Sequence, residues 1–296
     1  MNERLFARLA ALLADEPVAM ASVLHTVGAT PRKRGARMLI TATDSEFSIG
    51  GGLAEARVIA AARTLLAEAR REREIGIDLS GKPEAAGICG GHMQIALRRW
   101  SGLLDHARVQ EIASSLASGN IADLTADDLG SPADFDSALP DERLLIVGGG
   151  HCGRALYDLA VHLDFDIWMF DAQSLRLAAE DFPLATCLCG EYPTLARALD
   201  TKRRVHAVLL NRDFHADIAA LRVLAQAPPA FISMMGSRRR IAQVRAALPE
   251  CAQALAHLRA PTGLDIGAGT PHEIAVSILA QVIADRHLAG ARADNA

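Results

Sequence analysis

The sequence RLLIVGGGHCG, residues 143–153, places an apolar run directly before three spaced glycines. A helical pattern follows, and a second apolar run, FDIWMFD over residues 165–171, ends on Asp171. This order of strand, glycine loop, helix, strand and acid is typical of a dinucleotide-binding βαβ unit. It predicts a Rossmann-like domain with a parallel sheet.

Three glycines of the loop have predicted tasks. Gly148 permits a tight turn, Gly150 allows the backbone to approach a pyrophosphate, and Gly153 lets the helix lie close to the strand. The start of that helix offers N–H groups to an anion. Asp171 stands about 20 residues further on, where a carboxylate can accept hydrogen bonds from a ribose. NAD(P) or another nucleotide is therefore a candidate ligand, although such a unit can also serve as scaffold alone.

Outward from this unit, the second half of the chain alternates strands and helices. Strand-like runs recur around Leu144, Phe165, Ala185, His206 and Ala230. Alternation of this kind predicts a parallel sheet with helices on both faces, over residues 143–296. The last helix has a clear predicted start, because Thr270, Pro271 and Glu273 have the spacing of a capping box with proline in the first turn.

The first half predicts an N-terminal α/β domain over residues 1–120. Helical spacing marks residues 5–13 and 53–73, and strand-like runs cover residues 20–27, 37–41, 75–79 and 93–100. Residues 121–142 contain no Lys or Arg, gather aspartates, and include Gly130 and Pro132. This shift in composition predicts an acidic linker between the two domains.

Composition excludes several classes of protein. A net charge of −4 and an aromatic content of 4% argue against broad nucleic-acid binding. The chain lacks a long uncharged apolar run, so we expect no membrane span. The N-terminus lacks the pattern of a secretory signal, and five cysteines, an odd number, fit reduced thiols better than a disulfide set. We expect a cytoplasmic protein.

The cysteines differ in their surroundings. Cys89 lies between glycines in GICGGH, residues 87–92, where a thiol is approachable or simply fills a turn. Cys152 sits inside the glycine loop and can also fill space. Cys187 and Cys189 alternate along an expected strand, and Cys251 has no partner in sequence. No HExxH or GxSxG motif occurs, so the sequence assigns no catalytic residue.

Two clusters of arginine accompany glycines. One contains Arg32 in PRKRGAR, residues 31–37, and the other contains Ser237 and Arg238 in GSRRR, residues 236–240. The second cluster opens an expected helix, so backbone N–H groups add to the side-chain charges. Both places suit a phosphate, and a solvated charged face is the alternative.

Four segments taken together resemble the XdhC/CoxI family, the accessory proteins of xanthine dehydrogenase and related molybdenum hydroxylases. The segments are VGATPR with GARM and IGGGLAE (residues 27–32, 35–38 and 49–55), CGG (89–91), VGGGHCG (147–153), and MGSRR with PTGLDIG and its following TPxE (235–239, 261–267 and 270–273). They cover nearly the whole chain in order.

The resemblance implies a chaperone of the molybdenum cofactor rather than an enzyme with turnover. Such proteins bind the molybdopterin form, protect it while a cysteine desulfurase supplies the terminal sulfur, and deliver it to the apo-dehydrogenase. It also implies a homodimer and a Rossmann-like second domain. On this interpretation Cys89 contacts the metal, since molybdenum takes soft sulfur ligands. The pterin phosphate would dock on the loop from Gly148 to Gly153, on Arg32, and on Ser237 and Arg238.

Two positions depart from the family pattern. Cys152 stands where the glycine loop usually carries an aliphatic residue, and Gly52-Leu53 stands where some relatives carry a cysteine before the glutamate. A role for a second N-terminal thiol therefore does not transfer. Two other functions stay open: an NAD(P)-dependent oxidoreductase, which accounts for the glycine loop and Asp171, and a nucleotide-binding sensor without catalysis.

Overall fold

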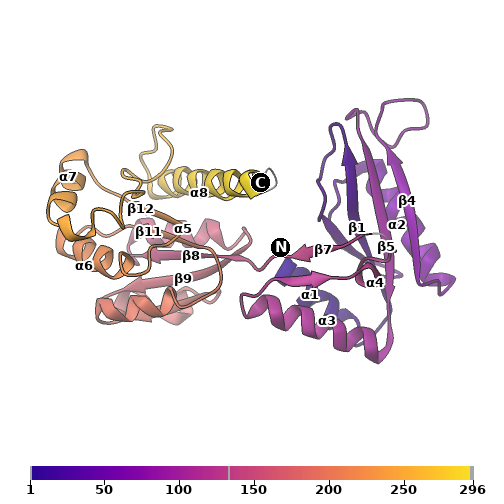
Figure 1. Ribbon diagram of the computed structural model, residues 1–296, viewed down its shortest axis with the longest axis horizontal. Coiled ribbons are helices and arrows are strands. Elements are labelled where there is room, and N and C mark those ends of the chain that lie inside the picture. The colour runs from indigo at the N-terminus through magenta and orange to yellow at the C-terminus, as the bar shows by residue number, and fades with distance from the viewer. Residues whose placement is uncertain (1, 133, 294–296) are drawn as a thin grey trace. The chain divides into compact units, whose positions relative to one another are not determined.

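The computed structural model describes residues 2–132 and 134–293, and it forms two compact units that divide between Pro140 and Asp141 (Figure 1). Each unit has its own sheet and its own cores. None of the helices in the described ranges is long and apolar enough to cross a bilayer.

The first unit is a five-stranded sheet in the order β3-β2-β1-β5-β4, with helices on both faces. The strands are β1 (Val18–Val27), β2 (Arg37–Ile40), β3 (Ser45–Phe47), β4 (Glu72–Asp78) and β5 (His92–Trp100), and neighbouring strands run antiparallel. The helices are α1 (Asn2–Leu12), α2 (Gly52–Ala67) and α3 (Gly102–Ala117). Alternate residues of β1 serve two cores, because Ala19 and Ala21 pack with α2 whereas Val18 and Met20 pack with α1 and α3.

Helix α2 is shorter than the sequence predicts. It ends at Ala67, residues 68–71 form a turn, and residues 72–73, also expected in the helix, begin strand β4. The turn is made by Ala69, whose φ of 52° is left-handed, and by a hydrogen bond from the Arg70 N–H to the Leu65 carbonyl. The alanine-rich composition gave no sign of this stop.

The acidic stretch 121–142 is not a linker, which corrects the sequence interpretation. It contains β6 (Ala122–Leu124), α4 (Ala126–Leu129) and β7 (Asp136–Ala138), and up to Pro140 it belongs to the first unit. Its aspartates pair with arginines from earlier in the chain, namely Arg37 with Asp136, Arg98 with Asp127, and Arg108 with Asp128. The composition of the stretch suggests an unstructured segment because the arginines that neutralise its aspartates lie outside it.

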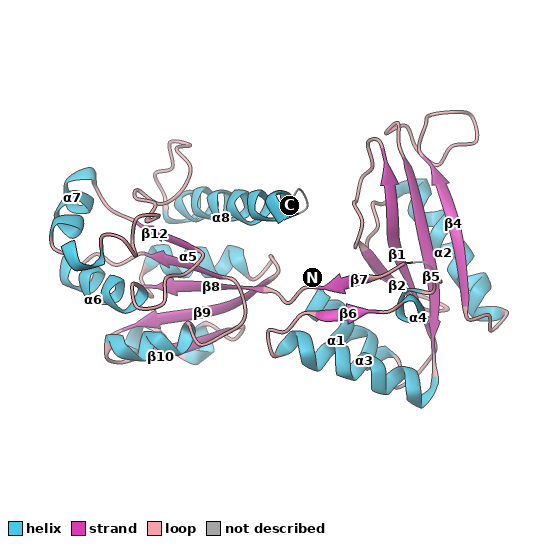
Figure 2. Ribbon diagram, in the orientation of Figure 1, coloured by secondary structure: helices cyan, strands magenta, loops and turns pink. Residues whose placement is uncertain are grey.

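The second unit is an all-parallel sheet in the order β10-β9-β8-β11-β12 (Figure 2). The strands are β8 (Glu142–Val147), β9 (Phe165–Asp171), β10 (Ala185–Cys189), β11 (Val205–Leu209) and β12 (Phe231–Met234). Helices α5 (His151–Ala160) and α8 (Pro271–Ala293) cover one face. Helices α6 (Phe214–Leu224) and α7 (Arg238–Ala246), with a 3-10 helix over Tyr192–Ala198, cover the other. The predicted α/β class and parallel sheet are confirmed.

The order of the strands reverses between β8 and β11, so the chain has a topological switch point there. In open parallel sheets ligands bind beyond the carboxyl ends of the strands at this point. The glycine loop follows β8, and Leu210 and Asn211 follow β11, so these two segments flank the switch point. The predicted start of α8 is also present, since the Thr270 N–H donates to Glu273 Oε2 at 2.9 Å.

Candidate functional site

The glycine loop contains both backbone features that its sequence predicts. Gly148 has a φ of 115°, which favours glycine, and it turns the chain out of β8. A Cβ on Gly153 would lie 1.9 Å from the Gly148 carbonyl oxygen, so α5 packs against the loop at a distance that only glycine allows. Gly150 is different, because no described atom beyond its chain neighbours lies within 4 Å of the Cβ position there. This open space leaves room for a ligand to approach the backbone.

Asp171 holds the loop in place instead of facing an open site. Its Oδ2 accepts a hydrogen bond from the Gly149 N–H at 2.9 Å, and its Oδ1 accepts one from the Gln173 N–H at 2.9 Å. The residue is 7% exposed. Each carboxylate oxygen thus accepts one backbone hydrogen bond and keeps a second acceptor site, but the side chain that is expected to receive a ribose is almost fully covered.

A cavity of about 370 Å³ lies beside the loop at the switch point. Its lining comes from Gly148, Gly149, Gly150, His151, Cys152, Arg154, Arg176, Leu210, Asn211, Arg212 and Met235. Three arginines thus line the cavity, Arg154 from α5 itself and Arg176 and Arg212 from other segments, and no aspartate or glutamate of the described chain lines it. No side chain in the described ranges caps α5 either. The chemistry of this cavity suits an anion such as phosphate.

Arg212 is a cation that sequence reasoning missed. Arg154 pairs with Asp181 at 2.9 Å, and Arg176 lies 3.8 Å from Asp171. Arg212 is exposed and makes no ion pair with any residue in 2–132 or 134–293. It belongs to no cluster or motif in the sequence, and only the pairing of β11 with β8 brings it to the cavity.

A buried ion pair fixes the backbone on both sides of Arg212. Arg240 pairs with Asp217, which is fully buried, and it donates to the carbonyls of Asn211 at 3.1 Å and Asp213 at 2.8 Å. The Asn211 amide donates to Asp217 Oδ1 at 3.2 Å. Burial raises the pKa of Asp217, and the Arg240 guanidinium opposes that shift. Arg240, a residue of the GSRRR segment, is thus a structural clamp.

The other residues of the GSRRR segment lie outside the cavity lining. Ser237 caps α7, and its Oγ accepts a hydrogen bond from the Arg240 N–H at 3.3 Å. Arg238 is exposed at the first position of the helix. The cavity is lined by Met235, two residues before Ser237, so the predicted pair stands next to the site without lining it.

In the first unit, three of the motif segments meet in one loop cluster, which we define as residues 28–35, 48–52 and 79–91. A Cβ on Gly91 would lie 2.3 Å from the Ala29 carbonyl oxygen, and one on Gly50 would lie 2.5 Å from Pro31 Cγ. The loops therefore touch through glycine backbones. Cys89 is exposed in this cluster. Arg32 is exposed as well, and its Cγ lies 3.8 Å from the Cβ position of Gly50.

Glu55 organises the start of α2 in this cluster. Its Oε2 accepts hydrogen bonds from Ser48 Oγ at 2.6 Å, the Gly51 N–H at 3.0 Å and the Ile49 N–H at 3.1 Å. Burial acts to raise the pKa of Glu55, but these hydrogen bonds outweigh it and hold the pKa below its usual value. A charged Glu55 thus fixes the glycine turn that precedes the helix.

The described residues contain no group of three His, Cys, Asp or Glu side chains placed to hold a metal ion.

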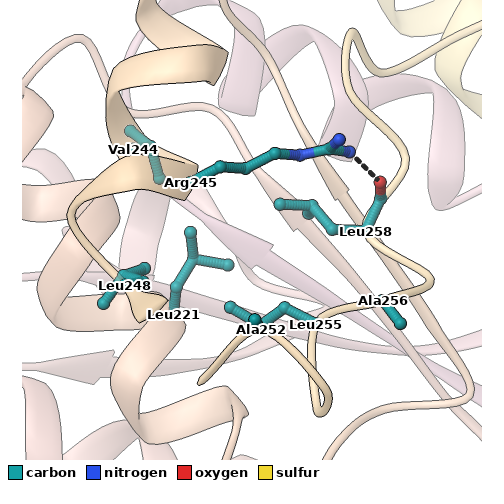
Figure 3. A pocket seen from close by; sticks show the side chains of 8 residues that line it. All are labelled: Leu221, Val244, Arg245, Leu248, Ala252, Leu255, Ala256 and Leu258. Atoms are coloured by element: carbon teal, nitrogen blue, oxygen red, sulfur yellow. Dashed lines mark hydrogen bonds between the residues drawn. The ribbon is translucent and has the colours of Figure 1, made fainter. Parts of the chain in front are cut away.

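A second cavity, of about 160 Å³, is lined mainly by apolar side chains of α6, α7 and residues 248–258 (Figure 3). Arg245 also lines it and donates to the Leu258 carbonyl at 3.1 Å. The predicted site residues lie elsewhere in the chain.

Comparisons with known proteins agree with the motifs. Residues 144–282 match a family model described as the XdhC Rossmann domain, and residues 11–76 match one described as the XdhC and CoxI family. An uncharacterized protein of Escherichia coli, YqeB, is 29% identical over 90% of this chain and 43% of its own length. A probable xanthine dehydrogenase subunit of Bacillus subtilis is 26% identical over 50% of this chain and 44% of its own. The chain thus spans less than half the length of these curated relatives.

A solved structure shares the fold of the whole chain. A crystal structure titled as a xanthine dehydrogenase from Bacillus halodurans superposes with a TM-score of 0.81. It covers 97% of this chain and 96% of its own, at 22% identity. The likeness extends over both units, and at this identity it shows the fold alone.

Proposed function

The chain belongs to the XdhC and CoxI family, and from this premise we propose that it is an accessory protein of xanthine dehydrogenase or a related molybdenum hydroxylase. Its cargo is the molybdenum cofactor in the molybdopterin form. The protein acts as a carrier without turnover: it holds the cofactor while a cysteine desulfurase installs the terminal sulfur, and it then delivers the cofactor to the apo-enzyme. A homodimer is part of this proposal.

The observation that carries the proposal is the cavity at the switch point of the second unit. Molybdopterin ends in a phosphate, and three arginines line this cavity together with the start of α5, with no carboxylate of the described chain in the lining. Cations and N–H donors are the groups that hold a phosphate in a protein. The residues present therefore fit the phosphate end of the cargo.

Cys89 of the first unit is a candidate soft donor for molybdenum. Its thiol is exposed in the loop cluster and approachable by a large ligand. A single thiolate would hold a metal less firmly than a full set of protein ligands and could release it. Reversible binding is what a carrier needs, and molybdenum accepts sulfur ligands.

The test is the molybdenum and pterin content of the protein, purified anaerobically from a host that makes the cofactor. We expect near-stoichiometric molybdenum and pterin in the wild type, and loss of both from Cys89→Ala without loss of fold. Cys189→Ala is the matched control, because Cys189 is also exposed and lies in the other unit. Wild-type protein without molybdenum or pterin would refute the carrier function.

An NAD(P)-dependent oxidoreductase is the second candidate, and the glycine loop after β8 is the observation in its favour. Asp171 weighs against it, because its carboxylate is buried and hydrogen-bonded to the backbone of the loop and of Gln173. A nucleotide-binding sensor meets the same objection. Nicotinamide-dependent turnover, or tightly bound nucleotide without molybdenum, would favour one of these candidates over the carrier.

A further inference from the structure

We propose that the cavity beside the glycine loop is a terminal-phosphate site without a ribose subsite: it binds a phosphate or diphosphate between the start of α5 and Arg212, and it does not recognise a nucleoside. The identity of the natural ligand rests on the proposed function, whereas the phosphate chemistry of the cavity does not. The cavity has a closed side toward β9 and an open side toward β11, and each side carries one part of the argument.

The side toward β9 is closed by the segment that follows Asp171. A Cβ on Gly149 would lie 2.7 Å from the Arg176 carbonyl oxygen and 2.8 Å from Leu177 Cδ2, so residues 176–177 press directly on the loop. Leu177 is buried. The two oxygens of Asp171 accept hydrogen bonds from the Gly149 and Gln173 N–H groups. A ribose placed as in a dinucleotide-binding domain would have to displace this segment.

The side toward β11 is open and carries an uncompensated cation. Arg212 lines the cavity, and no described residue pairs with it. Arg240 holds the carbonyls of Asn211 and Asp213, the two neighbours of Arg212 in the chain. The backbone that presents Arg212 is therefore fixed from both sides, which reduces the ordering that binding would require.

The rest of the ligand leaves the phosphate along the β11 side. Leu210 and Met235 form the apolar part of this wall, and their backbones extend the sheet through hydrogen bonds to Val147 and Leu209. The site thus suits a phosphate ester whose organic part is apolar on the side of Met235 and needs no hydrogen bond from Asp171. A guanidinium can meet a phosphate with two parallel hydrogen bonds, so Arg212 is a binding residue and Arg240 a positioning residue.

Titration calorimetry with inorganic pyrophosphate, ADP and NAD⁺ at low salt tests the proposal on the full chain. We expect pyrophosphate to bind, ADP to bind within about threefold of it, and NAD⁺ to bind no more tightly, since adenosine adds no contact. Arg212→Ala should weaken pyrophosphate binding by at least about tenfold. Arg222→Ala is the control, because it removes the same charge from an exposed position at the far end of α6, and it should change binding less than twofold.

Two outcomes would overturn the phosphate site: no binding of pyrophosphate, or equal binding by wild type and Arg212→Ala. A third would overturn the absence of a ribose subsite: ADP or NAD⁺ binds at least tenfold more tightly than pyrophosphate, and Asp171→Asn removes that advantage. The circular dichroism spectrum of each variant shows whether it folds, and Arg212→Lys, which keeps the charge but loses the paired donors, should fall between wild type and alanine. If the protein binds pyrophosphate through Arg212 but carries no molybdenum, the phosphate site stands and the carrier function is refuted. If the protein carries molybdenum but does not bind pyrophosphate, the carrier function stands and the phosphate site is refuted.

Discussion

Replacing Gly153 with alanine should destabilise the second unit, because the new methyl group has no space. Its Cβ would lie 1.9 Å from the Gly148 carbonyl oxygen and 3.0 Å from the Gly148 carbonyl carbon, and contacts below 3.0 Å are essentially never observed for a real Cβ. Helix α5 and the loop would have to separate by about 1 Å to relieve this contact. Neither partner is a flexible side chain that can rotate away.

The expected loss is about 2 kcal/mol in the free energy of unfolding. Overpacking costs about 1–3 kcal/mol, and a rigid backbone contact belongs at the upper end of that range. Alanine inside a helix recovers about 0.5–1 kcal/mol relative to glycine, because it restricts the unfolded chain. The steric cost exceeds the gain, so Gly153→Ala should remain folded but be clearly weakened.

Gly150→Ala is the matched control in the same loop. Gly150 has a φ of −71°, which any residue adopts, and no described atom beyond its chain neighbours lies within 4 Å of its Cβ position. Because Gly150 is the N-cap of α5, where alanine is less favourable than glycine, we expect its free energy of unfolding to fall by no more than about 1 kcal/mol. The pair therefore separates a glycine required for packing from a glycine that leaves space for a ligand.

Urea unfolding followed by tryptophan fluorescence measures both variants. The chain has two tryptophans, Trp100 in the first unit and Trp168 in the second. In a Trp100→Phe background Trp168 is the remaining tryptophan, so the signal reports the second unit alone. Equal stabilities for Gly153→Ala and Gly150→Ala would refute the steric reasoning.

Three further predictions concern the first unit and the thiols. Asp128→Ala should cost about 2–3 kcal/mol in a urea melt, because Asp128 is buried, closes the capping box of α4 and pairs with Arg108, whereas the exposed Asp123→Ala should cost less than about 0.5 kcal/mol; similar losses would restore the linker interpretation. Glu55→Gln should lower the free energy of unfolding by about 1 kcal/mol at pH 7. Because the folded pKa of Glu55 lies below its unfolded value, the difference in stability between wild type and variant should shrink as the pH falls below about 4.3. A difference that does not change with pH would contradict the role given to Glu55. Iodoacetamide should label Cys89 rapidly and leave Cys251, which is buried, unlabelled in the native protein, and mass spectrometry of the peptides would detect the opposite order.

Much of the fold could be predicted from local sequence. The five strands of the parallel sheet, the turn at Gly148 and the start of α8 at Thr270 all lie where the pattern places them. These features depend on residues a few positions apart, such as an apolar run before a glycine or a capping residue three positions before a glutamate. Signals of this kind involve residues close together in the chain, so they can be read from the sequence without knowing the fold.

The acidic stretch before Pro140 shows where such signals fail. Its aspartates pair with Arg37, Arg98 and Arg108, which precede the stretch in the chain. An ion pair between distant residues exists only once the chain has folded, so the composition of either partner alone suggests solvent exposure. The same limit hides the stop of α2 at Ala67 from a helix-forming composition.

Local sequence is enough to predict a glycine loop after the first strand of a parallel sheet and a thiol between glycines at Cys89. What the glycine loop faces depends on how the whole chain folds. The fold turns Asp171 inward onto the Gly149 N–H, and it brings Arg212 to the opposite side of the switch point. The physical reason is that the carboxyl ends of neighbouring parallel strands share one edge of the sheet. Which strands become neighbours, β8 and β11 in this case, is settled by packing over the whole unit.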